Sequence, residues 1–159
     1  MPLEKNFMLV PRKKIDITFR EISRGIFCLL NPFLKTSQLQ AEISKVWSQK
    51  SHQILPTLSV RSAFDLYLRT SAFPKGSEII MSGINIPDMV NIAKHHALKI
   101  IPLDIDIENM EISKENLSHL LTSNTKAVLI AHLYGAIIPM EGLLEVLKEH
   151  KHVHLIEDC

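Results

Sequence analysis

Two adjacent carboxylates, Glu157 and Asp158, come directly after the apolar run Val153–Ile156. A short apolar run of this kind predicts a β-strand, and the two acids then lie at its carboxyl end. Open α/β sheets bind their ligands beyond the carboxyl ends of their strands. We therefore expect these two acids to lie beside a ligand-binding site.

A second candidate for ligand binding is the start of a helix that we expect to run from Ser59 to about Ser71. Ser59 is a suitable N-cap, and Phe64 and Leu68 share the apolar face of this helix. The free N–H groups and the positive dipole end of a helix N-terminus attract anions. The residues alone therefore predict a small molecule that carries a phosphate, with a carboxylate across the pocket.

The elements that must position these groups alternate along the second half of the chain. Three further strands and three helix starts are expected there: residues 78–82, 99–103 and 126–131, then Pro87, Ser113 and Pro139. Short connections between alternating strands and helices favour parallel strands joined by right-handed crossovers. The predicted fold class is α/β, a three-layer fold with a mostly parallel sheet and helices on both faces.

Two amphipathic helices precede this alternation. The first ends at Asn31-Pro32, and a capping box that starts at Ser37 opens the second. We expect residues 1–54 to hold these leading helices and a connector, and to provide dimer contacts. Residues 55–159 are expected to form the α/β domain.

The composition is that of a folded globular protein, because 46% of the 159 residues are hydrophobic and 22% are charged. A net charge of +1 without a long basic block predicts no nucleic-acid binding. No apolar run approaches the ~18 residues of a membrane span, so no membrane partner is expected. Cys28 and Cys159 provide neither a disulfide framework nor zinc spacing, which favours the cytoplasm. His150, His152 and His154 need not share a face, so no metal site is expected.

Several short motifs occur in order between Leu55 and Cys159. They are Leu58–Phe64, Pro74–Ile80, Leu103–Asp106, Thr125–Val128, His132–Gly135 and Ile156–Asp158. In this order and spacing the sequence resembles the amino-terminal half of the large domain of the DegT/StrS-type sugar aminotransferases. These are pyridoxal phosphate (PLP) enzymes with the aspartate-aminotransferase fold, fold type I. The resemblance implies that residues 55–159 are an incomplete large domain of this fold.

The resemblance implies a cofactor site built from Asp158, Val60, Arg61 and Ile86. Asp158 matches the acid that pairs with the pyridinium nitrogen and keeps it protonated. Val60 and Arg61 stand where the family has Gly-Thr beside the cofactor phosphate, and a forked arginine grip would compensate for the lost hydroxyl. Ile86 takes the place of an aromatic ring over the cofactor face. His132 is expected to be a structural hydrogen-bonding residue.

The lysine that forms the Schiff base in this family lies beyond the match to Asp158, so no catalytic residue is assigned in residues 1–159. We expect a truncated or divided family member that is inactive alone. The family's reaction moves an amino group from an amino acid to a nucleotide-linked ketosugar. A homodimer, or pairing with a carboxyl-terminal half, is the partnership that the resemblance implies.

Two other functions stay open from the sequence. One is a non-catalytic binding or scaffold protein that pairs with a full-length relative of the same family. The other is an unrelated small doubly wound domain that binds phosphate and serves in regulation. The order of the motifs favours the aminotransferase interpretation over both.

Overall fold

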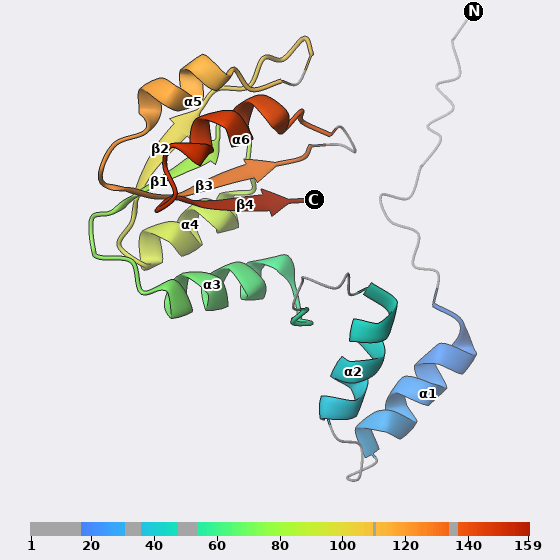
Figure 1. Cartoon of the computed structure of the whole chain (residues 1–159). Coiled ribbons are helices and arrows are strands. Elements are labelled where there is room, and N and C mark those ends of the chain that lie inside the picture. The colour runs from blue at the N-terminus through green and yellow to red at the C-terminus, as the bar shows by residue number, and fades with distance from the viewer. Residues whose placement is uncertain (1–16, 31–35, 48–53, 110, 134–136) are drawn as a thin grey trace, which may run out of the picture. The chain divides into compact units, whose positions relative to one another are not determined.

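The computed structural model describes residues 17–30, 36–47, 54–109, 111–133 and 137–159. It divides into an amino-terminal unit, Met1–Pro56, and a carboxyl-terminal unit, Thr57–Cys159 (Figure 1). Tyr134 and Gly135, which complete one of the motifs, lie outside the described residues.

The amino-terminal unit contains the two predicted leading helices, α1 (Phe19–Leu30) and α2 (Thr36–Trp47). A capping box begins α1, because Thr18 Oγ1 accepts from the backbone N–H of Glu21 (3.4 Å) while Glu21 Oε2 accepts from the N–H of Thr18 (2.6 Å). Ser37 lies inside α2, so the prediction that it opens this helix is wrong. No residue of α1 is buried, and Phe19, Ile22 and Ile26 expose much of their apolar surface.

The carboxyl-terminal unit is built on a four-stranded parallel sheet of strands β1 (Glu78–Ser82), β2 (Lys99–Leu103), β3 (Thr125–Ala131) and β4 (His154–Asp158). The strand order is β2-β1-β3-β4, with β1 and β3 at the centre. In the register, Ile79 lies opposite Ile100 and Ala127, and Leu129 lies opposite Ile156. The prediction of parallel strands is confirmed.

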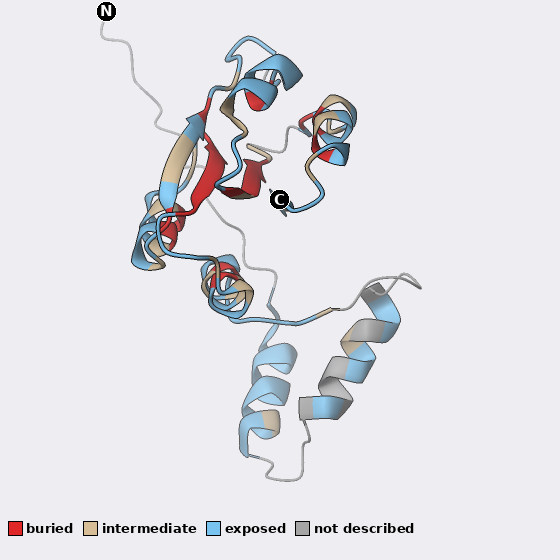
Figure 2. Ribbon diagram, turned by 60° about the vertical axis from the view of Figure 1, so that its left-hand side comes forward, coloured by how far each residue is buried: buried red, intermediate tan, exposed pale blue. Residues whose placement is uncertain are grey.

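Two helices pack against each face of this sheet (Figure 1): α3 (Val60–Ser71) and α4 (Pro87–His95) on one, α5 (Lys114–Leu120) and α6 (Glu141–Lys148) on the other. Successive strand side chains point to opposite faces, so each strand contributes to two apolar clusters. Ile79 and Leu129 pack with Phe64 of α3, and Ile80 packs with Leu143 of α6. The core strands are buried (Figure 2), and the three-layer prediction is confirmed.

The helix starts follow the caps in the sequence at three places. Ser59 accepts from the N–H of Ser62 (3.1 Å), Ser113 accepts from the N–H of Asn116 (3.3 Å), and Pro87 is the first residue of α4. The prediction for Pro139 is wrong, since α6 begins at Glu141.

Met140 is the N-cap of α6, and its carbonyl oxygen accepts from the N–H of Leu144 (2.8 Å). Just before the helix, the N–H of Ile138 donates to His132 Nδ1 (3.1 Å). Among the described ranges, every helix is too short or too polar to cross a bilayer.

A buried carboxylate closes the amino edge of the sheet. Glu78 is 7% exposed, and its carboxylate accepts from Thr122 Oγ1 (2.5 Å) and Lys99 Nζ (2.9 Å). The Thr122 hydroxyl and the Lys99 ammonium hold the pKa of Glu78 below its usual 4.5, against the opposing effect of burial. Ionised Glu78 therefore stabilises the folded state.

Glu78→Gln tests this contribution to stability. Because the folded-state pKa is lowered, the stabilisation is present above the unfolded pKa and is lost as the pH falls through the folded pKa. We expect E78Q to have a lower free energy of unfolding than the wild type at pH 7, and the difference to shrink toward pH 3, in urea unfolding. The exposed Glu149→Gln serves as a control for the charge change. A difference that does not depend on pH would contradict the assignment.

Ala97, just after α4, has the left-handed conformation with φ 57°. The N–H of Ala97 donates to Lys94 O (2.9 Å) and that of Leu98 to Ala93 O (3.1 Å), which is a helix end that glycine prefers. We expect Ala97→Gly to raise the free energy of unfolding by about 0.5–1 kcal/mol, because the Cβ strain is relieved. Ala63→Gly, inside α3, should instead lower it by about 0.5–1 kcal/mol. Thermal unfolding of both variants measures the two signs.

Candidate functional site

The candidate site lies at the edge of the sheet where the four parallel strands end, at Ser82, Leu103, Ala131 and Asp158. The helices run back antiparallel to the strands, and α3 begins at this same edge (Figure 1). Open α/β sheets bind ligands there. The structure therefore gathers at one edge the two groups that the sequence marked as ligand-binding.

The start of α3 is tied to the start of α4 by an ion pair. Arg61 Nε lies 3.1 Å from Asp88 Oδ2, and both side chains are about half exposed, at 51% and 58%. Asp88 is in the first turn of α4, and Ile86 is the N-cap of that helix with 51% of its surface exposed. The ion pair therefore places Val60 and Arg61 beside the loop that follows β1 and carries Ile86.

Asp158 points to the face of the sheet that α3 covers. His154 Nδ1 lies 2.5 Å from Tyr67 Oη of α3, and Ile156 packs into the cluster of that face. Because side chains alternate along a strand, Asp158 follows His154 and Ile156 onto the same face.

The start of α3 lies at the level of Asp158. Four strand residues from His154 to Asp158 advance ~13 Å, and about nine helix residues span the same length. Nine residues back from Tyr67 is Leu58, just before the N-cap of α3, so Asp158 and the start of this helix lie near the same end of the sheet. Val60, Arg61 and Ile86 thus lie toward the same edge and the same face of the sheet as Asp158, and their joint role in cofactor binding stays a prediction.

Glu157 points the other way and is held by His132. The carboxylate Oε2 of Glu157 lies 3.3 Å from His132 Nε2, and the histidine side chain is only 8% exposed. The N–H of Ile138 donates to the other ring nitrogen of His132, Nδ1, at 3.1 Å. His132 therefore acts as a structural hydrogen-bonding residue, as predicted.

Donors without acceptors gather at the same edge. Ser59 Oγ accepts from the Ser62 N–H and Ser59 O from the Ala63 N–H (3.0 Å), so the N–H groups of Val60 and Arg61 have no acceptor within the described residues. In the loop after β1, Asn85 Nδ2 is buried and has no partner in the described part of the chain. These donors fit an anionic or carbonyl-bearing ligand.

The close approach of strands β1 and β2 explains a glycine at this edge. Gly83 N–H donates to Leu103 O (2.7 Å), and a Cβ on Gly83 would lie only 3.3 Å from that oxygen. Ser82 Oγ accepts from the N–H of Ala131 (3.0 Å), which ties β1 to β3. The strand ends around the candidate site are therefore fixed by short hydrogen bonds.

A hollow of about 320 Å³ adjoins the ion pair on the outer side of α3 and α4, lined by Arg61, Asp65, Asp88, Asn91, Ile92 and His95. Within it, Asp65 accepts from His96 Nε2 and Arg69 Nη2, both at 2.8 Å. The hydrogen bond from His96, more than the charge of Arg69, lowers the pKa of Asp65 against the effect of burial. The hollow therefore carries paired charges of both signs.

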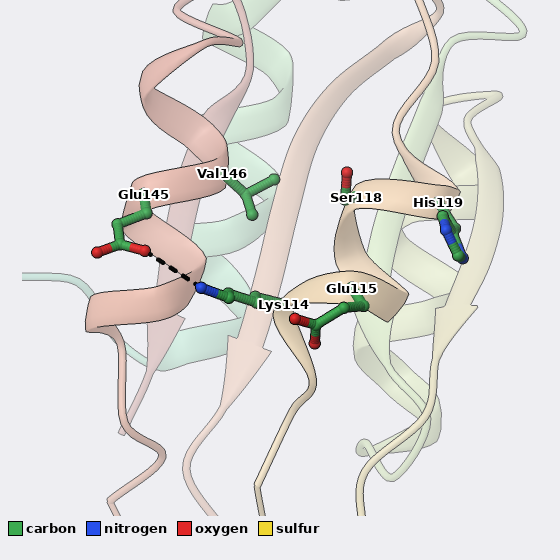
Figure 3. Close-up of a pocket in the computed structure, with 6 residues that line it drawn as sticks. All are labelled: Lys114, Glu115, Ser118, His119, Glu145 and Val146. Carbon is green, nitrogen blue, oxygen red and sulfur yellow. Dashed lines mark hydrogen bonds and ion pairs between the residues drawn. The ribbon is translucent and has the colours of Figure 1, made fainter.

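A separate hollow of about 370 Å³ lies between α5 and α6, on the opposite face of the sheet (Figure 3). It is lined by Lys114, Glu115, Ser118, His119, Glu145 and Val146. Lys114 Nζ reaches Glu145 Oε2 (3.5 Å), so its charge is already paired. Among the described residues no cluster of three or more His, Cys, Asp or Glu side chains is arranged as metal ligands.

Residues 35–159 match the DegT/DnrJ/EryC1/StrS aminotransferase family, and this chain belongs to that family. GDP-perosamine synthase from Escherichia coli O157:H7 is 29% identical over 153 residues, which cover 94% of this chain and 42% of that protein. L-glutamine:2-deoxy-scyllo-inosose aminotransferase from Streptomyces fradiae is 29% identical over 106 residues, which cover 66% of this chain and 24% of that protein. The chain thus spans less than half the length of these two curated relatives.

Solved structures show the same fold. The PLP form of Spr1654 from Streptococcus pneumoniae superposes with a TM-score of 0.76 at 21% identity, over 91% of this chain and 38% of that one. The E. coli GDP-4-keto-6-deoxy-D-mannose-3-dehydratase with bound hydrated PLP gives 0.73 at 20% identity, over 95% and 40%. The predicted fold, part of the fold type I transferase large domain, is confirmed.

Sequence reasoning missed the partners of the candidate residues. Asp88 was not singled out, although an acid in the first turn after Pro87 is a visible signal. The contact between His132 and Glu157 carried no local signal, since His132 follows β3, Glu157 lies in β4, and the two meet only through the pairing of these strands.

Binding of inorganic phosphate tests the start of α3. Asp88 neutralises Arg61 and repels an anion, so we expect Asp88→Asn to tighten phosphate binding about two- to fivefold and Arg61→Gln to weaken it by a similar factor. Phosphate titrations followed by backbone amide shifts of Val60 and Arg61 measure both. Arg61→Gln should weaken phosphate binding more when Asp88 is already replaced by Asn than when Asp88 is present. Phosphate affinities that change in the same direction and by the same factor in the two single variants would contradict the assignment.

Proposed function

We propose that this chain supplies the cofactor-binding part of a PLP-dependent aminotransferase that acts on a nucleotide-linked ketosugar. The observation that carries the proposal is that Asp158 and the start of α3 share one edge and one face of the sheet, in a chain that belongs to a sugar aminotransferase family. Matched relatives with PLP in their structures support the choice of cofactor. The name of GDP-perosamine synthase supports a nucleotide-linked sugar as substrate.

The residues at this edge fit the cofactor in type and charge. The unpaired N–H groups of Val60 and Arg61, together with the positive end of α3 and the Arg61 guanidinium, would hold its phosphate. Asp158 would hold the ring nitrogen in its protonated form, which a neutral amide could not do. Ile86 would pack on the ring without stacking as an aromatic residue does. When bound, the cofactor supplies an electron sink for carbanion chemistry.

The amino donor and the catalytic lysine complete the proposal. The name of the Streptomyces fradiae relative supports an amino acid such as L-glutamine as donor. No lysine of residues 1–159 matches the family's Schiff-base position, so we propose that the amine comes from a carboxyl-terminal half or from another polypeptide. Residues 1–159 alone then bind the cofactor without transaminating. The free thiols of Cys28 and Cys159 suit a reducing cytoplasm.

The amino-terminal residues 1–54 are proposed to make contacts with a partner chain, either a second copy or a full-length relative. Support comes from α1, whose Phe19, Leu29 and Leu30 are 87%, 87% and 77% exposed within its own unit. The same exposure favours the second function, a non-catalytic scaffold that pairs with a relative. Co-purification with a family member, without cofactor in the complex, would favour this scaffold.

Asp158→Asn tests the proposed ring contact in the full chain. Asparagine keeps the shape but loses the charge, so we expect the Kd for PLP to rise about tenfold, the strength of one hydrogen bond to a charged group. Glu149→Gln, an equal charge change at an exposed site, should leave the Kd within twofold. Equilibrium dialysis gives the Kd values.

Borohydride reduction followed by mass spectrometry checks the proposal on the lysine. We expect no lysine of residues 1–159 to be labelled in stoichiometric amount by PLP. One fully labelled lysine, or a Kd that D158N leaves unchanged, would contradict the proposal.

A further inference from the structure

His132 makes three hydrogen bonds at the carboxyl edge, and the proposed function uses none of them. Its backbone N–H donates to Asp158 O (2.8 Å). Its Nδ1 accepts from the N–H of Ile138 (3.1 Å), and its Nε2 lies 3.3 Å from Glu157 Oε2. One residue thus connects the end of β3, the connection to α6 and the tip of β4.

The hydrogen bonds determine which ring nitrogen carries the proton. A backbone amide can only donate, so Nδ1 must be the acceptor and therefore carries no hydrogen. The hydrogen of the neutral ring is then on Nε2, where it faces the carboxylate of Glu157. The His132 side chain is 8% exposed and that of Glu157 is 48% exposed. The histidine is therefore the more tightly packed of the two, and it holds the position of the glutamate.

The alternation of the strand separates the roles of the two acids. Glu157 turns to the face of α5 and α6, where His132 holds it, and Asp158 turns to the face of α3. A rotation or slip at the tip of β4 would exchange the faces of the two carboxylates, and the contacts of His132 to both residues oppose it.

We infer that His132 is a positioning residue, which holds Glu157 and the tip of β4 so that the Asp158 carboxylate faces the start of α3. The role of Asp158 toward a cofactor rests on the proposed function. The position of the tip does not, and it can be measured without any ligand.

Hydrogen exchange of the amide of residue 132 in the full chain measures this position, because that amide is bound to Asp158 O. Glutamine at 132 can place a donor where Nε2 lies, and asparagine can place only an acceptor where Nδ1 lies. We expect Glu157→Ala and His132→Asn to lower the protection of this amide about five- to tenfold, and His132→Gln to keep it within about twofold of the wild type. The amide of Leu129, within β3, should not change.

Unchanged protection of amide 132 in E157A would overturn the inference. So would an equal loss at Leu129, because that indicates loosening of the whole sheet. E157A keeps the native histidine, so it decides the outcome even where the His132 variants fail to fold.

Titrations with PLP and with inorganic phosphate separate this inference from the proposed function. We expect E157A to weaken PLP binding about fivefold while phosphate binding stays within about twofold, since only the ring contact depends on the tip. If D158N weakens PLP binding and E157A does not, the positioning role of His132 fails and the proposed function stands. If D158N has no effect, the proposed ring contact fails, and hydrogen exchange alone decides the position of the tip.

Discussion

The pairing of β3 on both of its sides is the constraint on which the rest of the carboxyl-terminal unit depends. Six of the seven residues of β3 are buried, and the strand pairs in parallel with β1 and with β4. Parallel pairing forces the carboxyl ends of all the strands to one edge, and the helices must then return antiparallel on either face. The candidate site at that edge therefore follows from how the core strands align, and its residues need not be near one another in the sequence.

Much of this architecture could be predicted because its signals are local. Buried parallel strands are near-continuous apolar runs, and the structure gives β1 and β2 the predicted residues and begins β3 one residue earlier. Ser59 and Ser113 mark helix starts through hydrogen bonds to amides three residues away. The prediction for Pro139 was wrong because the N-cap is the following residue, Met140, which makes no side-chain cap hydrogen bond that the sequence could signal.

The location of the candidate site could be predicted from the sequence, whereas most of its side-chain contacts could not. The resemblance implied a site built from Asp158, Val60, Arg61 and Ile86, and these residues lie toward the carboxyl edge of the sheet. What the sequence could not give is the partner of each charge, because partners such as Asp88 depend on which faces of two helices meet. That Glu157 and Asp158 point to opposite faces could be predicted, because side chains alternate along a strand. Which acid faces which layer of helices is known only from the strand pairing.

Strand β4 lies at the edge of the sheet, and this position gives its polar residues a second role. Within the described residues β4 pairs only with β3, so its other side presents unpaired N–H and C=O groups that could template another strand. His154, Glu157 and Asp158 give this border a polar and acidic character that disfavours stacking of one molecule on the next. Asp158, which we propose as the partner of the cofactor ring, therefore also belongs to the polar border that disfavours contact between molecules.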